Sequence, residues 1–131
     1  MSIEVEELIE EINKDGRRTI RTVTDMFAVP SHPLQKRIGE WRQITFGTPH
    51  VDALHRRARE EMAEFQDVIH HNKFATMKEA ADVVVTLFAL ADHQGFDLLT
   101  AVERVQDQNE LRRWKRHGDG TGQHIKEAVH E

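Results

Sequence analysis

The stretch from Val83 to Ala91, Val-Val-Val-Thr-Leu-Phe-Ala-Leu-Ala, limits the possible folds more than any other part of the chain. On a helical wheel it is apolar on almost every side, which indicates a helix buried in the middle of a bundle. Proline and glycine separate this stretch from its neighbours, and the other segments between them also have a helical period. No segment alternates convincingly as a strand does, so we expect an all-α helical bundle.

Capping and helix-ending residues divide the chain into about five helices, and its 131 residues suit a single domain, 1–131. Thr48-Pro49 has the form of a cap followed by proline in the first turn. The segment from Thr76 to Glu79 has the form of a capping box, and Asp97 that of another cap. We therefore expect helices at about residues 2–15, 33–45, 49–71, 76–95 and 97–117.

This domain then has three parts: N-terminal helices with an irregular segment over residues 1–47, central helices over 48–117, and a glycine-rich tail over 118–131. The tail contains Gly-Asp-Gly-Thr-Gly at 118–122, which resembles a phosphate-binding loop only superficially because it lacks the lysine and the preceding strand. We expect a flexible turn there.

Composition restricts the function further. The chain has no cysteine, which excludes disulfides, thiol nucleophiles and cysteine zinc sites and favours a cytoplasmic location. The net charge of −5 argues against a general nucleic-acid binder, because neutralising phosphates requires a basic surface. The richest apolar stretch, Ala80 to Ala91, contains Asp82 and is too short to span a bilayer, so we expect no membrane segment.

Acidic side chains on the inner faces of two predicted helices are the most informative residues. In the helix at 49–71, Glu61 lies in the middle of an apolar stripe, and Glu64 lies one turn further along near the same edge. In the next helix, Glu79 and Asp82 share one face. On antiparallel neighbouring helices these four carboxylates converge where desolvation disfavours their charge, which something positive must compensate.

Hard divalent cations are the natural compensation. Magnesium and manganese prefer carboxylate oxygens and keep water and substrate phosphate in their remaining positions. The spacing therefore predicts a metal site with open coordination. The two acid pairs fall at somewhat different heights along the hairpin, so the turn at residues 70–75 must absorb the offset.

Some of these residues also have an ordinary structural explanation. Glu60 could form a solvent-exposed ion pair with Arg56 or Arg57, and Glu79 could merely return a hydrogen bond within the capping box. These alternatives stay open for the single residues, but they do not explain why both acid pairs lie on inner faces.

Nine histidines raise a second metal hypothesis. Asp67 with His70, and Glu127 with His130, have the i, i+3 spacing of di-iron carboxylate bundles. Neither pair continues the stripe around Glu61, and His130 is the penultimate residue. We therefore favour the carboxylate site.

The acidic residues also carry a family resemblance. Glu60-Glu61-Met-Ala-Glu64, followed after fourteen residues by Glu79-Ala-Ala-Asp82, resembles the EExxE and ExxD motifs of the all-alpha nucleotide pyrophosphohydrolase superfamily. This superfamily includes MazG, dimeric dUTPases, dCTP pyrophosphatases and phosphoribosyl-ATP pyrophosphohydrolases, and the similarity covers roughly residues 54–115. The resemblance implies a MazG-like bundle whose central antiparallel helix pair binds Mg²⁺, or Mn²⁺ in its place. The implied ligands are Glu61, Glu64, Glu79 and Asp82, and Glu60 is a candidate outer ligand.

The resemblance implies an enzyme that hydrolyses a nucleoside triphosphate, a dNTP or a non-canonical NTP, to the monophosphate and pyrophosphate, in a house-cleaning role for the nucleotide pool. Glu61 or Glu64 is the candidate for orienting the attacking water. The family holds phosphates with a polar and basic segment on the next helix, whose counterparts here are Asn109, Arg112, Arg113 and Lys115. A solvated helix end is the ordinary explanation of that segment. The family forms dimers or tetramers, so we expect a homodimer or homotetramer.

Two other functions stay open. A phosphoribosyl-ATP pyrophosphohydrolase would share the metal site and differ in the base pocket, which one sequence does not identify. A non-enzymatic helical interaction module would instead use the acids to bind a basic partner, and it would leave them exposed.

Overall fold

The computed structural model describes residues 29–126, and most of this length is helical, as the sequence predicted. The helix expected at residues 2–15 lies outside the described residues. The described residues belong to two compact units, 29–101 and 102–126, which are taken in turn. The elements are α3 (Pro33–Phe46), α4 (Val51–Val68), α5 (Lys73–Gln94), α6 (Leu98–Leu111), β1 (Trp114–Arg116) and β2 (Gly122–His124).

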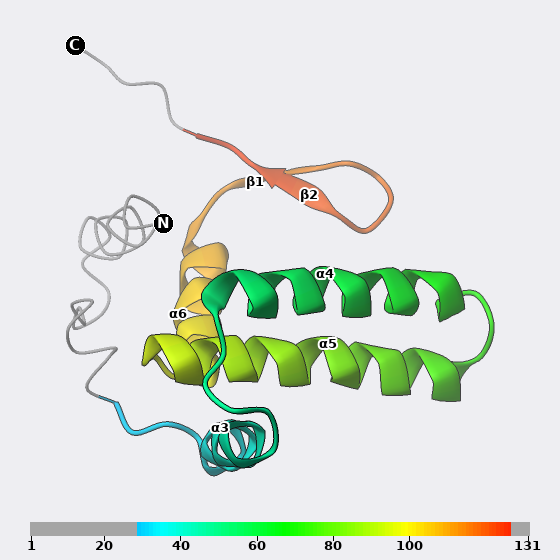
Figure 1. Ribbon diagram of the computed structural model, residues 1–131. Coiled ribbons are helices and arrows are strands. Elements are labelled where there is room, and N and C mark those ends of the chain that lie inside the picture. Colours follow the sequence, from blue (N-terminus) through cyan, green and yellow to red (C-terminus); the bar gives the residue numbers. More distant parts are fainter. Residues whose placement is uncertain (1–28, 127–131) are drawn as a thin grey trace. The chain divides into compact units, whose positions relative to one another are not determined.

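Helices α4 and α5 form an antiparallel pair joined by a short turn, and α3 lies against α5 (Figure 1). The predicted stripe of α4 is inward-facing, with Leu54 and Glu61 buried. On α5 the buried residues are Val83, Thr86, Phe88, Ala89 and Ala91. Val84 and Val85 are exposed, however, so within the described residues α5 is not enclosed on all sides as its composition predicted.

Helix α5 begins three residues earlier than the capping-box pattern predicted. Its N-cap is Asn72, whose side-chain oxygen accepts a hydrogen bond from the backbone N–H of Ala75 at 2.8 Å. Asparagine is among the best N-cap residues, so it outcompetes the later signal. The hydroxyl of Thr76 instead donates to the Asn72 carbonyl at 2.9 Å, within the first turn of the helix. The capping-box explanation of Glu79 is therefore wrong.

Helix α4 begins two residues later than predicted, because Thr48 has a different partner. The Thr48 hydroxyl accepts a hydrogen bond from Gln43 Nε2 at 3.0 Å, which connects it back to α3. The N-cap position falls to His50, which makes no side-chain capping bond. The helix also ends at Val68 rather than near residue 71, because the chain turns there into the Asn72 cap.

A buried polar network joins α3 to the turn between α5 and α6. Gln35 is 0% exposed, and its amide donates to the Phe96 carbonyl at 2.7 Å and accepts from the Leu98 N–H at 2.9 Å. Asp97 caps α6, as predicted, through the Thr100 N–H at 2.8 Å. Burial alone would raise the pKa of Asp97, but hydrogen bonds from Thr100 and from the His32 N–H outweigh it and lower that pKa.

Gly39 permits close packing of α3 against α5. A Cβ atom at this position would lie 1.9 Å from the Asp92 Oδ2 atom, far inside van der Waals contact. Glycine therefore lets the Asp92 carboxylate approach the backbone of α3.

The second unit contains a hairpin where the sequence predicted the end of a helix and a flexible tail. Helix α6 ends at Leu111 rather than near residue 117, and Trp114–Arg116 pairs antiparallel with Gly122–His124. The expectation of no strand is thus wrong for this segment. Trp114 contributes to the change, because its Nε1 atom donates to the Asn109 carbonyl at the helix end at 2.7 Å.

The glycine-rich run is the turn of this hairpin. Gly118 and Gly120 both have φ of 91°, a backbone conformation that glycine adopts without strain. Asp119 fixes the turn by accepting hydrogen bonds from the N–H and the hydroxyl of Thr121 at 2.9 and 2.6 Å.

No helix within residues 29–126 combines the length and apolarity needed to cross a membrane.

Candidate metal centre

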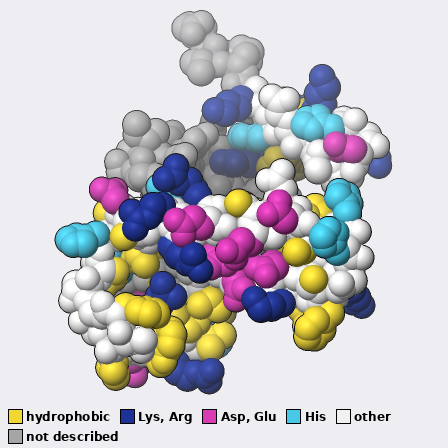
Figure 2. Space-filling view, turned by 45° about the vertical axis from the view of Figure 1, so that its right-hand side comes forward, with side chains coloured by type: hydrophobic (Ala, Val, Ile, Leu, Met, Phe, Trp, Pro, Cys, Tyr) yellow, Lys and Arg dark blue, Asp and Glu magenta, His cyan; other side chains and the backbone are white. Residues whose placement is uncertain are grey.

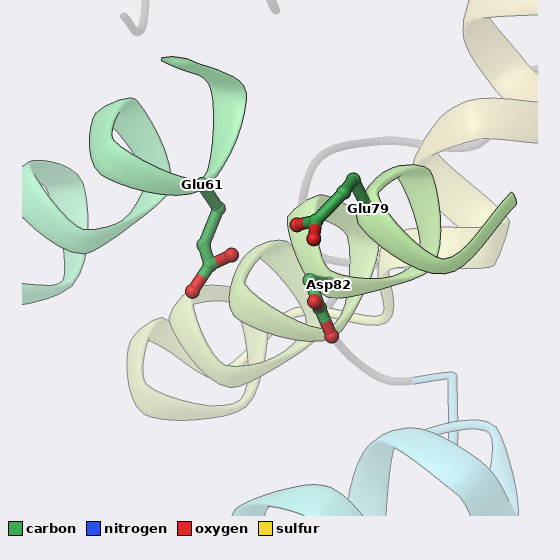
Figure 3. A group of neighbouring side chains, drawn as sticks. All are labelled: Glu61, Glu79 and Asp82. Carbon is green, nitrogen blue, oxygen red and sulfur yellow. The ribbon is translucent and has the colours of Figure 1, made fainter. Parts of the chain in front are cut away.

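Three acidic side chains converge between α4 and α5 (Figure 3). Glu61 comes from α4, and Glu79 and Asp82 come from α5. One carboxylate oxygen of each lies within 4.8 Å of one from each of the other two. The structure therefore brings together three of the four acids that the sequence predicted as metal ligands.

The turn between the helices sets this register. Glu61 lies seven residues before the end of α4 at Val68, and Glu79 and Asp82 lie six and nine residues after the start of α5 at Lys73. At about 1.5 Å per helical residue, these three positions reach similar heights along the antiparallel pair. Glu64 lies about one turn nearer the connection than Glu61 and is not one of the three acids that converge.

Burial distinguishes Glu61 and Glu79 from ordinary surface carboxylates. Glu61 is 6% exposed, and the side chains of Glu79 and Asp82 are 17% and 38% exposed. The Oε2 atoms of Glu61 and Glu79 are buried and have no hydrogen-bond partner among residues 29–126. A buried carboxylate oxygen without a partner is energetically costly, so each of these atoms is suited to a ligand beyond those that residues 29–126 supply.

Two cations lie against the same carboxylates. Arg57 pairs with Glu61 through Nη2 and Oε1. Lys78 pairs with Asp82 through Nζ and Oδ2 at 2.9 Å and lies 3.5 Å from Glu79 Oε1. Figure 2 shows the acidic side chains gathered in one patch and bordered by lysine and arginine. Neither cation was predicted to belong to the site. Arg57 and Lys78 stand four residues before Glu61 and Asp82, and this i, i+4 spacing is the signal that could have identified them.

The electrostatic environment of Glu61 disfavours its charged form. Burial is the largest cause and raises its pKa, and the neighbouring Glu64 and Asp82 raise it further, whereas Arg57 acts in the opposite direction. The net result is a pKa above the usual glutamate range. A divalent cation would reverse this, because it stabilises the ionised carboxylate strongly.

The two remaining predicted acids are exposed. Glu60 pairs with Arg57 at 3.0 Å and with Arg56 at 3.8 Å, which is the ordinary ion pair that the sequence analysis considered for it. Glu64 lies close enough to Glu61 to raise its pKa but is exposed to solvent. Their metal-binding roles remain predictions.

The donor set fits a hard divalent cation. It consists of carboxylate oxygens, the ligands that magnesium and manganese prefer. In an octahedral Mg²⁺ site, opposite ligands lie about 4.2 Å apart and neighbouring ligands about 2.9 Å, so three oxygens within 4.8 Å of one another would move closer together to share one ion. The buried oxygens of Glu61 and Glu79 would both gain a partner.

The predicted phosphate-binding residues belong to the second unit. Asn109 lies in the last turn of α6, Arg112 and Arg113 follow the helix, and Lys115 lies on β1. The expectation that all four residues lie on one helix is therefore wrong, because that helix ends at Leu111. The phosphate-binding role itself stays a prediction.

Two comparisons with known proteins bear on this site, and a search of family models found no match. The chain is 33% identical over 92 residues to a dATP/dGTP diphosphohydrolase of Salmonella phage PMBT28. The match covers 70% of this chain, which spans only 30% of the length of that relative. The structure resembles that of a Cyanophage S-2L MazG-like pyrophosphohydrolase bound to dGDP and three catalytic Mn²⁺ ions per active site. The TM-score is 0.61 and the sequence identity 24%, and the similarity covers 72% of this chain and 92% of the cyanophage chain.

The all-α fold of this chain is that of MazG-like pyrophosphohydrolases. The sequence similarity to the phage diphosphohydrolase and this structural similarity together support assigning the chain to the MazG-like nucleotide pyrophosphohydrolase superfamily, as its EExxE and ExxD motifs predicted.

Proposed function

We propose that this chain is a divalent-metal-dependent nucleoside triphosphate pyrophosphohydrolase that cleaves the bond between the α and β phosphates. One observation carries the proposal: three carboxylates on two helices converge within 4.8 Å, and two of their oxygens are buried without a partner among the described residues. A helical interaction module would leave such acids exposed to a basic partner. The burial of Glu61 at 6% exposure does not fit that alternative.

Mg²⁺ is the proposed cofactor, with Mn²⁺ as a substitute. Glu61, Glu79 and Asp82 would hold it, with Glu64 as a further ligand and Glu60 as an outer one. When bound, the ion supplies positive charge against the triphosphate and activates its coordinated water. Support comes from the acidic donor set and from the Mn²⁺ ions in the structurally similar cyanophage protein.

The protein side chains would then position the reactants. Glu61 or Glu64 would orient the attacking water by accepting its hydrogen bond, since both lie on the same edge of α4. Asn109, Arg112, Arg113 and Lys115 would bind phosphate oxygens, for which guanidinium groups offer a planar pair of donors.

A deoxynucleoside triphosphate with a purine base is the proposed substrate. Support comes from the relative, which is named for dATP and dGTP, and from the cyanophage protein, which binds dGDP. Phosphoribosyl-ATP is the main alternative, because it would present a similar phosphate group to the same acids. A house-cleaning role in the cytoplasmic nucleotide pool is part of this proposal.

The test is a panel of canonical and damaged nucleoside triphosphates, with phosphoribosyl-ATP included, incubated with Mg²⁺ or Mn²⁺ and read by pyrophosphate release. We expect the fastest release from dATP and dGTP and none in the presence of EDTA. Turnover of phosphoribosyl-ATP alone would replace the proposed substrate class. Failure of every compound with both metals would refute the enzymatic function.

We also propose that the chain forms a homodimer or homotetramer through the outer face of α5. Phe74, Met77 and Val84 recur on this face at helical spacing and are 72%, 59% and 43% exposed. Such a stripe is a typical protein contact surface. A second copy of the chain is the proposed occupant.

A further inference from the structure

We infer that Arg57 is a positioning residue for the metal centre, which holds Glu61 by one carboxylate oxygen and leaves the other oxygen available to the cluster. The inference rests on the proposed function, since it takes Glu61, Glu79 and Asp82 to bind a divalent cation. It assigns a role to a residue outside both acidic motifs.

The contacts of Arg57 fix the orientation of Glu61. Arg57 stands one helical turn before Glu61 on α4, and its Nη2 atom pairs with Glu61 Oε1. Its Nη1 atom binds Glu60 Oε2 at 3.0 Å, so the two arms of the guanidinium engage neighbouring acids. Glu61 Oε2 is left buried and without a partner among the described residues. The carboxylate is thus held on one side and free on the other.

This arrangement differs from a simple surface ion pair. Exposed pairs contribute little to stability and hold neither partner firmly. Here the Glu61 side chain is 8% exposed and the Arg57 side chain 49%, so the pair joins a buried acid to a cation at the surface. Partners that hydrogen-bond a ligand from behind orient it toward its metal, and their loss weakens metal binding.

Helix α5 repeats the pattern with Lys78. Its Nζ atom contacts Asp82 Oδ2 at 2.9 Å and Glu79 Oε1 at 3.5 Å, while Glu79 Oε2 stays buried and unpartnered within the described part of the chain. On α5, then, the cation pairs at i, i+4 with Asp82, whereas the buried unpartnered oxygen belongs to Glu79, the residue after Lys78. The pattern is clearer for Arg57, because its guanidinium has two directed contacts and its acid is the more buried.

Removing Arg57 has two opposing effects on metal affinity. Loss of a nearby positive charge favours cation binding, whereas loss of the fixed Glu61 orientation disfavours it. If Arg57 merely competes with the metal for Glu61, its removal tightens metal binding. If it positions Glu61, removal weakens metal binding, so the sign of the change distinguishes the two roles.

The experiment is calorimetric titration of the full chain with MnCl₂, comparing wild type with Arg57→Gln, Arg57→Lys and Arg56→Gln. Arg57→Lys keeps the charge but loses the planar pair of donors. Arg56→Gln removes the same charge from a residue that contacts Glu60 at 3.8 Å, whereas the ion-pair partner of Glu61 is Arg57. We expect about 10–100-fold weaker Mn²⁺ binding in both Arg57 variants and no weakening in Arg56→Gln.

Kinetics provide the second measurement. Because Arg57 acts through Glu61, the Mn²⁺ concentration for half-maximal pyrophosphate release should rise in Arg57→Gln, while the rate at saturating Mn²⁺ approaches that of wild type. Unchanged or tighter Mn²⁺ binding in Arg57→Gln would overturn the inference, and so would a rate that stays low at saturating metal. If the wild-type protein binds no Mn²⁺, the proposed function is refuted together with this inference. If the wild type binds Mn²⁺ and Arg57→Gln binds it equally well, only this inference is refuted.

Discussion

At the scale of single residues, Glu61 carries the largest electrostatic cost in the site. Its carboxylate is buried between two helices, close to Glu64 and Asp82, and Arg57 offsets these effects in part. Natural proteins retain such costly groups mainly where function requires them. The cost also makes Glu61 a sensitive reporter of metal binding.

The raised pKa of Glu61 predicts a pH-dependent loss of stability in EDTA. Below about pH 4.3, the ordinary glutamate pKa, this group is protonated in both folded and unfolded chains. As the pH rises, the unfolded chain loses its proton first, so the free energy of unfolding falls until the folded-state pKa is passed. Melting temperatures of wild type and Glu61→Gln in EDTA should therefore diverge with rising pH, with the variant becoming the more stable.

Saturating Mn²⁺ should reverse this trend for wild type, because the ion binds the ionised carboxylate. Melting curves collected from pH 4 to pH 7, with EDTA and with Mn²⁺, measure both effects. A difference between wild type and Glu61→Gln that does not vary with pH would show that Glu61 titrates normally.

Asp82→Asn should abolish activity while preserving the fold. The substitution keeps the shape of the side chain but removes the charge that a hard cation requires. We expect at least about a 100-fold loss of pyrophosphate release, and a melting temperature in EDTA equal to or above that of wild type. Asp67→Asn, an exposed acid on α4, is the matched control and should retain activity.

Sequence reasoning located the acids of the site but not their exact grouping. Glu61, Glu79 and Asp82 were predictable because each lies on the inner face of a helix, which the wheel reveals directly. The position of Glu64 depended on the turn, whose register a wheel does not contain. Arg57 was considered only as an exposed ion-pair partner of Glu60, and its contact with the buried Glu61 at i, i+4 was not predicted.

At the scale of elements, the α4–α5 hairpin is the part of the fold that builds the site. The sequence predicted both helices, and α5 ends at Gly95 as expected, where φ of 81° suits glycine. Errors arose where two local signals competed, as with Asn72 and Thr76 at the start of α5. The hairpin at residues 114–124 was missed because its strands are short and depend on the turn around Gly118 and Gly120.

Gln35 should be a main stabilising contact of α3. Its buried amide makes two hydrogen bonds to the backbone around Asp97, and Gln35→Ala would leave the Phe96 carbonyl and the Leu98 N–H without partners. We expect a loss of about 2 kcal/mol in the free energy of unfolding, measured by urea denaturation. Gln43→Ala is the control, because Gln43 is exposed, and should cost no more than about 0.5 kcal/mol. Equal effects of the two substitutions would contradict a structural role for the buried network.

At the scale of the whole molecule, the exposed stripe of α5 links the site to assembly. Phe74, Met77 and Val84 lie on the same helix as Glu79 and Asp82, so a second copy packed on this stripe would restrain the helix that supplies two metal ligands. Assembly and metal binding would then stabilise the same element.

Met77→Glu should dissociate the assembly. A charge in the middle of the stripe would be buried without a partner in the oligomer but solvated in the monomer. Sedimentation velocity should show a larger species for wild type and a monomer for the variant. Gln66→Glu, at an exposed position on α4, adds the same charge and should leave the assembly intact. A monomeric wild type, or an unchanged assembly in Met77→Glu, would contradict the proposed interface.

The most direct test of the central claim is anomalous diffraction from crystals of the wild-type protein grown with Mn²⁺, recorded at the manganese absorption edge. The account predicts anomalous density between α4 and α5, with oxygens of Glu61, Glu79 and Asp82 at about 2.0–2.3 Å from an ion. If the crystals hold fully occupied manganese ions but none of them is bound to these three carboxylates, the central claim is contradicted.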